Sequence, residues 1–328
     1  MGVTEKYHLY ELDKTTADVM SEEALKEAEL ENPEQIFEGV IYDKDRIGTR
    51  IFRGTQGSQP RVLKVQFLEP DIEEAVIMQD INNRRYPNLR HPHVYDYQDH
   101  DPVRGYGYTL MEDVKGRPIF EGLANREEME EFADATQEIR INRQTNPVFQ
   151  PKIYERDART ATALRLANWN AIALRKGTLD REGIGHSTRH LLQMTLGDID
   201  KMEFTHGHLT SKDIVVTEKG ENVVFSPSFW SYRPKYYETT FQIWDSLKSL
   251  EGDEILSPKE AIAHCEEWKE TFMQTPGIKE DVFFSRYFAS NMRERAIGAL
   301  LLDINQDHEG EDNRRQKEMF REILCHYS

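Results

Sequence analysis

The sequence predicts an α+β protein in which a strand-rich first third precedes a longer, mainly helical part. Three runs near the start, at 36–42, 50–53 and 61–67, are apolar or alternate in the period-two pattern of strands. After about residue 114, apolar residues recur at helical spacing, as in the segment 126–143. Segregated strands and helices of this kind are typical of the α+β class.

A short hairpin is expected inside the helical part. Two β-branched, apolar runs at 214–216 and 223–225 flank a charged turn with Gly220 near its tip. Polar side chains stand just before the first run and just after the second. Because a hairpin brings these two ends together, it can direct the side chains toward one point.

Composition limits the kinds of protein to consider. The chain has 328 residues, enough for two lobes with separate cores, and a net charge of −17 that argues against nucleic acid or an anionic membrane as a partner. Cys265 and Cys325 are far apart, which argues against a disulfide scaffold and fits a reducing compartment. With no apolar run of membrane-spanning length and no signal-peptide pattern, we expect a soluble, cytoplasmic protein.

The remaining elements follow in order. An acidic helical arm is expected at 1–37, with its helix ending near Pro33. A helix at 71–85 follows the strands, and His91 and His93 are interpreted as residues of an exposed turn. Further helices are expected at 189–202, at 257–274 with Ser257 and Glu260 as a capping box, and at 280–303 and 313–326.

Lys64 lies inside an apolar strand, where an unpaired ammonium group would be costly to bury. One interpretation makes Lys64 an edge residue whose side chain faces water. The other pairs it with a glutamate of the next helix, and of Glu73 and Glu74 we favour Glu74.

The segment around the hairpin resembles the catalytic and metal-binding loops of the aminoglycoside phosphotransferase-like, choline kinase-related kinases, especially their fungal branch. In the first loop Thr205, His206, Gly207, Leu209 and Ile214 match the family pattern. His208 stands where the family has its catalytic aspartate, and Asp213 where it has a metal-binding asparagine.

The second loop resembles the family less closely. Pro234, Tyr236 and Glu238 keep its frame, which puts Ser226 where a metal-holding aspartate belongs. Pro227 and Ser228 then stand at the following tryptophan and glutamate positions.

The resemblance implies a bilobal protein kinase-like fold with a small β-rich N-lobe at 38–113 and a larger α-rich C-lobe at 114–328, the latter carrying the hairpin region 204–238. It also implies that Lys64, paired with Glu74, would hold the phosphates of ATP. Met111 and Glu112 would begin a hinge segment whose backbone meets adenine.

The altered residues imply a changed function. Phosphoryl transfer depends on positioned metal ions, and a serine hydroxyl is a poor substitute for a carboxylate ligand of Mg²⁺. We therefore expect a protein that has lost phosphotransfer, requires no metal or cofactor, and uses the interlobe cleft for cyclisation, isomerisation or a similar step on a small organic molecule. His208, Ser226, Asp213 and His206 are the candidate catalytic residues.

Two alternatives remain open. The chain could be a non-catalytic pseudokinase that binds a protein partner. It could also be an unusual ATP-dependent small-molecule kinase or nucleotidyl transferase, in which case Mg-ATP would be the cofactor.

Overall fold

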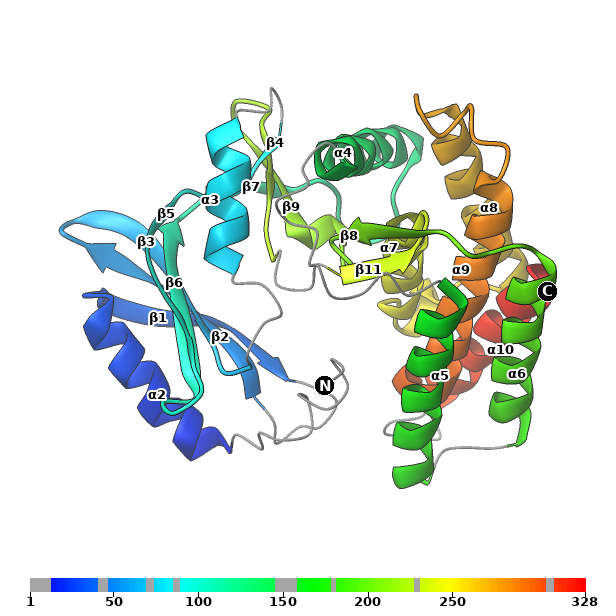
Figure 1. Cartoon of the computed structure of the whole chain (residues 1–328), viewed down its shortest axis with the longest axis horizontal. Coiled ribbons are helices and arrows are strands. Elements are labelled where there is room, and N and C mark those ends of the chain that lie inside the picture. Colours follow the sequence, from blue (N-terminus) through cyan, green and yellow to red (C-terminus); the bar gives the residue numbers. More distant parts are fainter. Residues whose placement is uncertain are drawn as a thin grey trace. The chain divides into compact units, whose positions relative to one another are not determined.

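The computed structural model describes residues 13–40, 47–68, 74–84, 89–144, 158–177, 181–226, 231–304 and 310–328. The chain divides into two compact units, one made of Met1–Arg117 and Asp213–Phe229, the other of Pro118–Lys212 and Trp230–Ser328. Residues 213–226 therefore pack with the first unit, while the lobe boundaries predicted at residues 37 and 113 stay predictions. The protein is an α+β protein, as the sequence predicts (Figure 1).

The first unit is built on a five-stranded antiparallel sheet with the order β1-β2-β3-β6-β5. Neighbouring strands along the sequence pair directly except where β6 joins β3. The strands are β1 (Glu31–Val40), β2 (Ile47–Gln56), β3 (Gln59–Gln66), β5 (Val94–Asp101) and β6 (Tyr106–Glu112).

One helix packs on each face of this sheet, and alternate strand residues supply apolar side chains to both faces. Helix α2 (Lys14–Glu27), capped by the Asp13 carboxylate, packs against the face that carries Leu63 and Val65. Helix α3 (Glu74–Arg84) packs its Ala75 and Met78 against the opposite face. Alternate residues of β3 therefore serve two separate apolar clusters, and the side chain of Lys64 belongs to the α3 face.

The predicted hairpin is present. Strands β9 (Ile214–Thr217) and β10 (Asn222–Val224) pair antiparallel, with Val223 opposite Val215. Gly220 has a φ of +75° in the connecting turn, a left-handed conformation that glycine adopts at little cost. The short strands β4 (Leu89–Arg90) and β7 (Gly116–Pro118) extend the hairpin to a four-stranded sheet in the order β4-β10-β9-β7.

The second unit is mainly helical and contains one two-stranded ladder, β8 (Met202–Thr205) with β11 (Ser231–Pro234). Helix α8 begins with the predicted capping box, in which Ser257 and Glu260 exchange hydrogen bonds. The helices are α4 (Arg126–Gln144), α5 (Ala158–Arg175), α6 (Arg181–Leu196), α7 (Tyr237–Lys248), α8 (Pro258–Gln274), α9 (Phe284–Gly298), which continues into a π-helical turn at Ala299–Asp303, and α10 (Glu311–His326).

Three local predictions were wrong. Helix α2 ends at Glu27, and Pro33 lies inside β1 rather than after a helix, because β1 is an edge strand that tolerates a residue without an amide hydrogen. Helix α6 ends at Leu196 instead of reaching residue 202, which belongs to β8. His91 is 2% exposed, because its ring binds the carbonyl oxygen of Val224, although His93 is exposed as expected.

Within the described ranges, no helix is long and apolar enough to cross a membrane.

Candidate functional site

The first cluster of predicted site residues is a buried ion pair. Lys64 lies on β3, a central strand between β2 and β6, so the interpretation as a water-facing edge residue was wrong. Its Nζ atom is 2.5 Å from Glu74 Oε2, and the two side chains are 7% and 1% exposed. Glu74 is the first residue of α3, and Glu73 lies outside the described residues. The pairing is present, while its role in binding phosphates stays a prediction.

Met111 and Glu112 have structural partners. The Met111 side chain is buried in the apolar cluster beneath α3. Glu112 accepts two hydrogen bonds from Arg90, at 2.6 and 3.0 Å, and a third from the amide of His93. Burial alone would raise the pKa of Glu112, but the hydrogen bonds from Arg90 and His93 outweigh it and the pKa is lowered. Any contact of this segment with adenine would therefore have to use its backbone.

The hairpin brings Asp213 and Ser226 to one end, as the sequence predicts. Ile214 pairs with Val224, and the amide of Phe225 donates to the carbonyl oxygen of Asp213 at 2.8 Å, so the ladder continues by one step. Both side chains are half-buried. Ser226 has a φ of +55°, a conformation that costs a non-glycine residue about 1–2 kcal/mol. Ser228 lies outside the described residues.

The loop with the two histidines belongs to the second unit and is fixed by α7. The amide of Gly207 donates to Glu238 Oε1 at 3.1 Å, and the amide of Ser211 donates to Gln242 Oε1. Glu238 and Gln242 are four residues apart and so lie on one face of the helix. Two backbone amides of the loop are thereby held in place by a single turn of α7.

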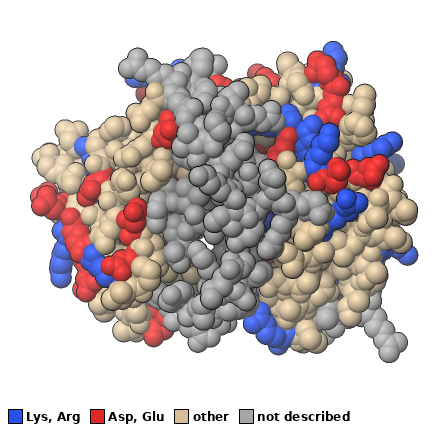
Figure 2. All heavy atoms as spheres, in the orientation of Figure 1, with Lys and Arg blue, Asp and Glu red and all other residues tan. Residues whose placement is uncertain are grey.

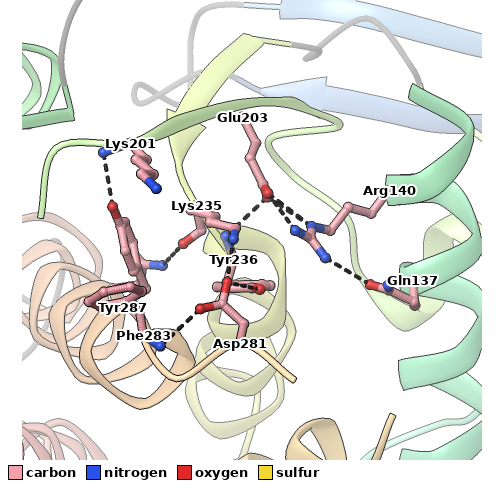
Figure 3. A network of polar contacts seen from close by, with 10 residues as sticks. Gln137, Arg140, Lys201, Glu203, Lys235, Tyr236, Asp281, Phe283 and Tyr287 are labelled. Atoms are coloured by element: carbon pink, nitrogen blue, oxygen red, sulfur yellow. Dashed lines mark hydrogen bonds and ion pairs between the residues drawn. The ribbon is translucent and has the colours of Figure 1, made fainter. Parts of the chain in front are cut away.

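A polar network fixes the strand that leads into this loop (Figure 3). Arg140 of α4 forms a two-pronged pair with Glu203 of β8, with Nη2 2.8 Å from Oε1, and stacks over the ring of Tyr236. The Tyr236 hydroxyl donates to Asp281 at 2.6 Å, and Asp281 also binds Lys235. These contacts tie β8 to the start of α7 and so help to position the histidine loop.

His206 and His208 differ in their surroundings. His206 is fully buried, which suits a structural role better than contact with a ligand. His208 is exposed, and its ring centroid lies 4.4 Å from that of Phe241. Loss of hydration on the buried side lowers the pKa of His208, and the charges of Arg295 and Arg233 lower it further. The imidazole of His208 is therefore neutral at pH 7.

The two residues that the resemblance places at metal-ligand positions differ in chemistry. Mg²⁺ prefers carboxylate oxygens, and of the two residues at the expected ligand positions only Asp213 offers one. Ser226 contributes a neutral hydroxyl. In the part of the chain that the structure describes, no three His, Cys, Asp or Glu side chains are grouped as a metal site.

Sequence reasoning missed a set of arginines near His208. Arg165, Arg233 and Arg295 come from α5, β11 and α9, and all three guanidinium groups lie over the ring of Tyr237. The available signal was the charged run 293–295 in a helix whose neighbouring residues are apolar. In the structure, all residues of α9 from Ser290 to Gly298 are buried.

On the face drawn in Figure 2, positive and negative side chains of the described residues are interspersed.

Known structures share the fold of this chain at low sequence identity. A thermostable mutant of the aminoglycoside phosphotransferase APH(4)-Ia, in a ternary complex with ADP and hygromycin B, is 14% identical with a TM-score of 0.58, and the match covers 93% of this chain and 98% of that one. An amicoumacin kinase in complex with AMP-PNP and Ca²⁺ is 10% identical with a TM-score of 0.59, covering 95% and 96%. An ethanolamine kinase of Plasmodium vivax is 11% identical with a TM-score of 0.53, covering 92% and 82%.

The protein therefore has the protein kinase-like fold of the aminoglycoside phosphotransferases and of ethanolamine kinase. Neither a protein-family model nor a curated protein sequence matches the chain.

Proposed function

We propose that this kinase-fold protein has lost efficient phosphoryl transfer and carries out metal- and ATP-independent chemistry on a small organic molecule. The observation that carries the proposal is the residue set of the two loops. Ser226 ends the hairpin where a carboxylate would hold a metal ion, and His208 replaces the carboxylate that would orient the attacking hydroxyl.

Together, the two replacements should greatly lower the rate of phosphoryl transfer. Removing general-base assistance typically costs about 10²–10⁴-fold in rate. A histidine can replace the base function in part, but it cannot supply negative charge beside a metal ion. Because the metal ions neutralise the charge on the transferred phosphoryl group, weakening their clamp adds a separate penalty. Efficient turnover of Mg-ATP is therefore not expected.

The side chains that remain suit acid–base chemistry. His208 is exposed, and its lowered pKa leaves a neutral imidazole that can accept a proton at pH 7. Its loop is held by two backbone contacts from α7, so the ring starts from a fixed backbone. Cyclisations and isomerisations require such a group together with a substrate held in one conformation.

Mg-ATP turnover tests the loss of phosphotransfer. Phosphate release from ATP would be measured for the wild type, for Lys64→Met, and for a His208→Asp/Ser226→Asp variant that restores both carboxylates. We expect no release by the wild type above that of Lys64→Met. A wild-type rate that requires Mg²⁺ and disappears in Lys64→Met would overturn the proposal.

A second candidate is an unusual ATP-dependent small-molecule kinase or nucleotidyl transferase. The buried Lys64–Glu74 pair favours it, because such a pair would be retained to hold phosphates. The similar structures described above are kinases. Radiolabel on the γ-phosphate or on the α-phosphate of ATP, followed into product, would separate the two activities from each other and from the first proposal.

A further inference from the structure

Three positive side chains converge on one aromatic ring in the second unit. The guanidinium carbons of Arg165, Arg233 and Arg295 lie 5.5, 5.3 and 5.1 Å from the centre of the Tyr237 ring. Tyr237 is 3% exposed, so this convergence takes place below the surface. The arginines come from three elements far apart in sequence, so no local helix periodicity accounts for their meeting.

Two carboxylates, Glu294 and Asp303, interact with the three arginines, so the cluster keeps an excess of positive charge. Glu294 forms an ion pair with Arg165 and also accepts from the Thr162 hydroxyl at 3.1 Å. Burial alone would raise the pKa of Glu294, but the charges of Arg165 and Arg295 outweigh it and hold the pKa at about 2. The other carboxylate is Asp303, whose pKa is raised by burial although the charge of Arg295 acts to lower it. Glu294, already paired with Arg165, and Asp303 therefore face three guanidinium groups.

In two of the guanidinium groups the Nε–H donor has no hydrogen-bond partner. The Nε atoms of Arg233 and Arg295 are buried and make no hydrogen bond. Among the described residues, neither side chain forms an ion pair like that of Arg165. Arg295 is 6% exposed and is surrounded by aromatic rings, with centres 4.8, 5.4 and 5.3 Å from its guanidinium carbon in Trp169, Phe241 and Trp244.

Such an arrangement is costly without a ligand. A guanidinium group does not lose its proton in a protein, so burial cannot be relieved by neutralisation. Contacts with ring faces offset part of the charge but leave the two buried Nε–H donors unsatisfied. A planar fork of N–H groups matches the oxygens of a carboxylate or a phosphoryl group. The rings around Arg295 fix the orientation of its donors in advance.

We propose that Arg233 and Arg295 form a binding site for an oxyanion, a carboxylate or phosphoryl group, of a small organic molecule. The site deepens the proposed function, because it makes the substrate an anion whose charged group is held beside His208. That group would replace the missing counter-charge of the cluster and place the rest of the molecule within reach of the imidazole.

Thermal unfolding of the full chain provides the first test. Wild type would be compared in inorganic phosphate, in benzoate and in sodium chloride at equal ionic strength. We expect phosphate or benzoate to raise the midpoint by at least about 2 °C, the response to a ligand well above its Kd. A response to one anion only would identify the phosphoryl group or the carboxylate as the preferred chemistry. No response to either anion would overturn the proposal.

Variants locate the site. Arg233→Gln should abolish the response, whereas Arg286→Gln removes an exposed arginine from α9 and should keep it. Lys64→Met should also keep it, which separates this site from a phosphate site in the first unit. If Arg233→Gln responds as the wild type does, the proposal is wrong. If Arg233→Gln does not fold, Arg295→Lys, which keeps the charge but loses the fork, should weaken the response.

The pKa of His208 distinguishes an anion site from an arginine cluster with a structural role only, because it would change on adding an anion only in the first case. A bound anion offsets the charges of Arg233 and Arg295, so the pKa of His208 followed by NMR should rise when benzoate or phosphate is added. An unchanged pKa at saturating anion would contradict the placement beside His208.

These measurements contain no ATP, so they are independent of the test of the proposed function. Mg-ATP turnover by the wild type would overturn the proposed function and leave the proposed anion site unaffected.

Discussion

The buried pair of Lys64 and Glu74 yields a sharp prediction about stability. The two side chains are 7% and 1% exposed and their charged atoms lie 2.5 Å apart. Removing one partner of such a pair leaves an uncompensated buried charge, which costs about 3–5 kcal/mol. Lys64→Met and Glu74→Leu should each destabilise the first unit by this amount. The double variant should recover most of the loss, because no buried charge remains.

The assay must report on the first unit. The four tryptophans, Trp169, Trp230, Trp244 and Trp268, all lie in the sequence ranges of the second unit, so their fluorescence does not follow the sheet directly. Hydrogen exchange of the β3 amides measures the free energy of opening where the pair sits.

The control for this prediction is an ion pair of the same unit in which the buried carboxylate, Asp113, keeps a second partner, Arg53. Lys115→Met removes an ammonium group that is 65% exposed and leaves Asp113 paired with Arg53, so it should change stability by less than about 1 kcal/mol. The reasoning is refuted if Lys64→Met and Glu74→Leu each stay within about 1 kcal/mol of the wild type in free energy of unfolding. It is also refuted if the double variant loses as much stability as the two single variants lose together.

Three further outcomes are expected. Ser257→Ala should lower the free energy of unfolding by about 1 kcal/mol, because Ser257 caps α8; an unchanged thermal midpoint would contradict this. Tyr236→Phe should cost about 1.5–3 kcal/mol, since its hydroxyl donates to the Asp281 carboxylate at 2.6 Å; urea titration measures the loss, and a cost below about 0.5 kcal/mol would count against the network. Burial raises the pKa of Asp303 to about 6 from 3.8, so the folded state binds the proton more tightly and stability falls as pH rises between these values. Asp303→Asn should therefore match the wild type near pH 4 and exceed it by roughly 2 kcal/mol at pH 7, after allowance for solvent screening; equal pH profiles would refute the assignment.

Local patterns predicted the hairpin and the capping box. Both depend on neighbours in sequence: β-branched runs around a glycine turn for 214–224, and a serine three residues before a glutamate for α8. The preference for Glu74 over Glu73 came from the frame of the family pattern, and the observed ion pair agrees with it.

Features that depend on long-range packing could not be predicted from the sequence. From the sequence, Lys64 could be either a water-facing edge residue or the partner of a helix glutamate. Only the strand order shows that β3 lies between β2 and β6. The burial of His91 depends on β10, more than a hundred residues away. The arginine cluster requires α5, β11 and α9 to meet, and nothing local in these segments predicts that their charged side chains turn inward.

The metal dependence of ATP affinity tests the central claim most directly. If Ser226 has removed the metal clamp, any ATP held through Lys64 should bind the wild type with the same Kd in Mg²⁺ as in excess EDTA. Ser226→Asp should restore a tighter Kd in Mg²⁺. The account is contradicted if Mg²⁺ tightens ATP binding to the wild type by about tenfold, which is 1.4 kcal/mol, because the clamp would then still be working.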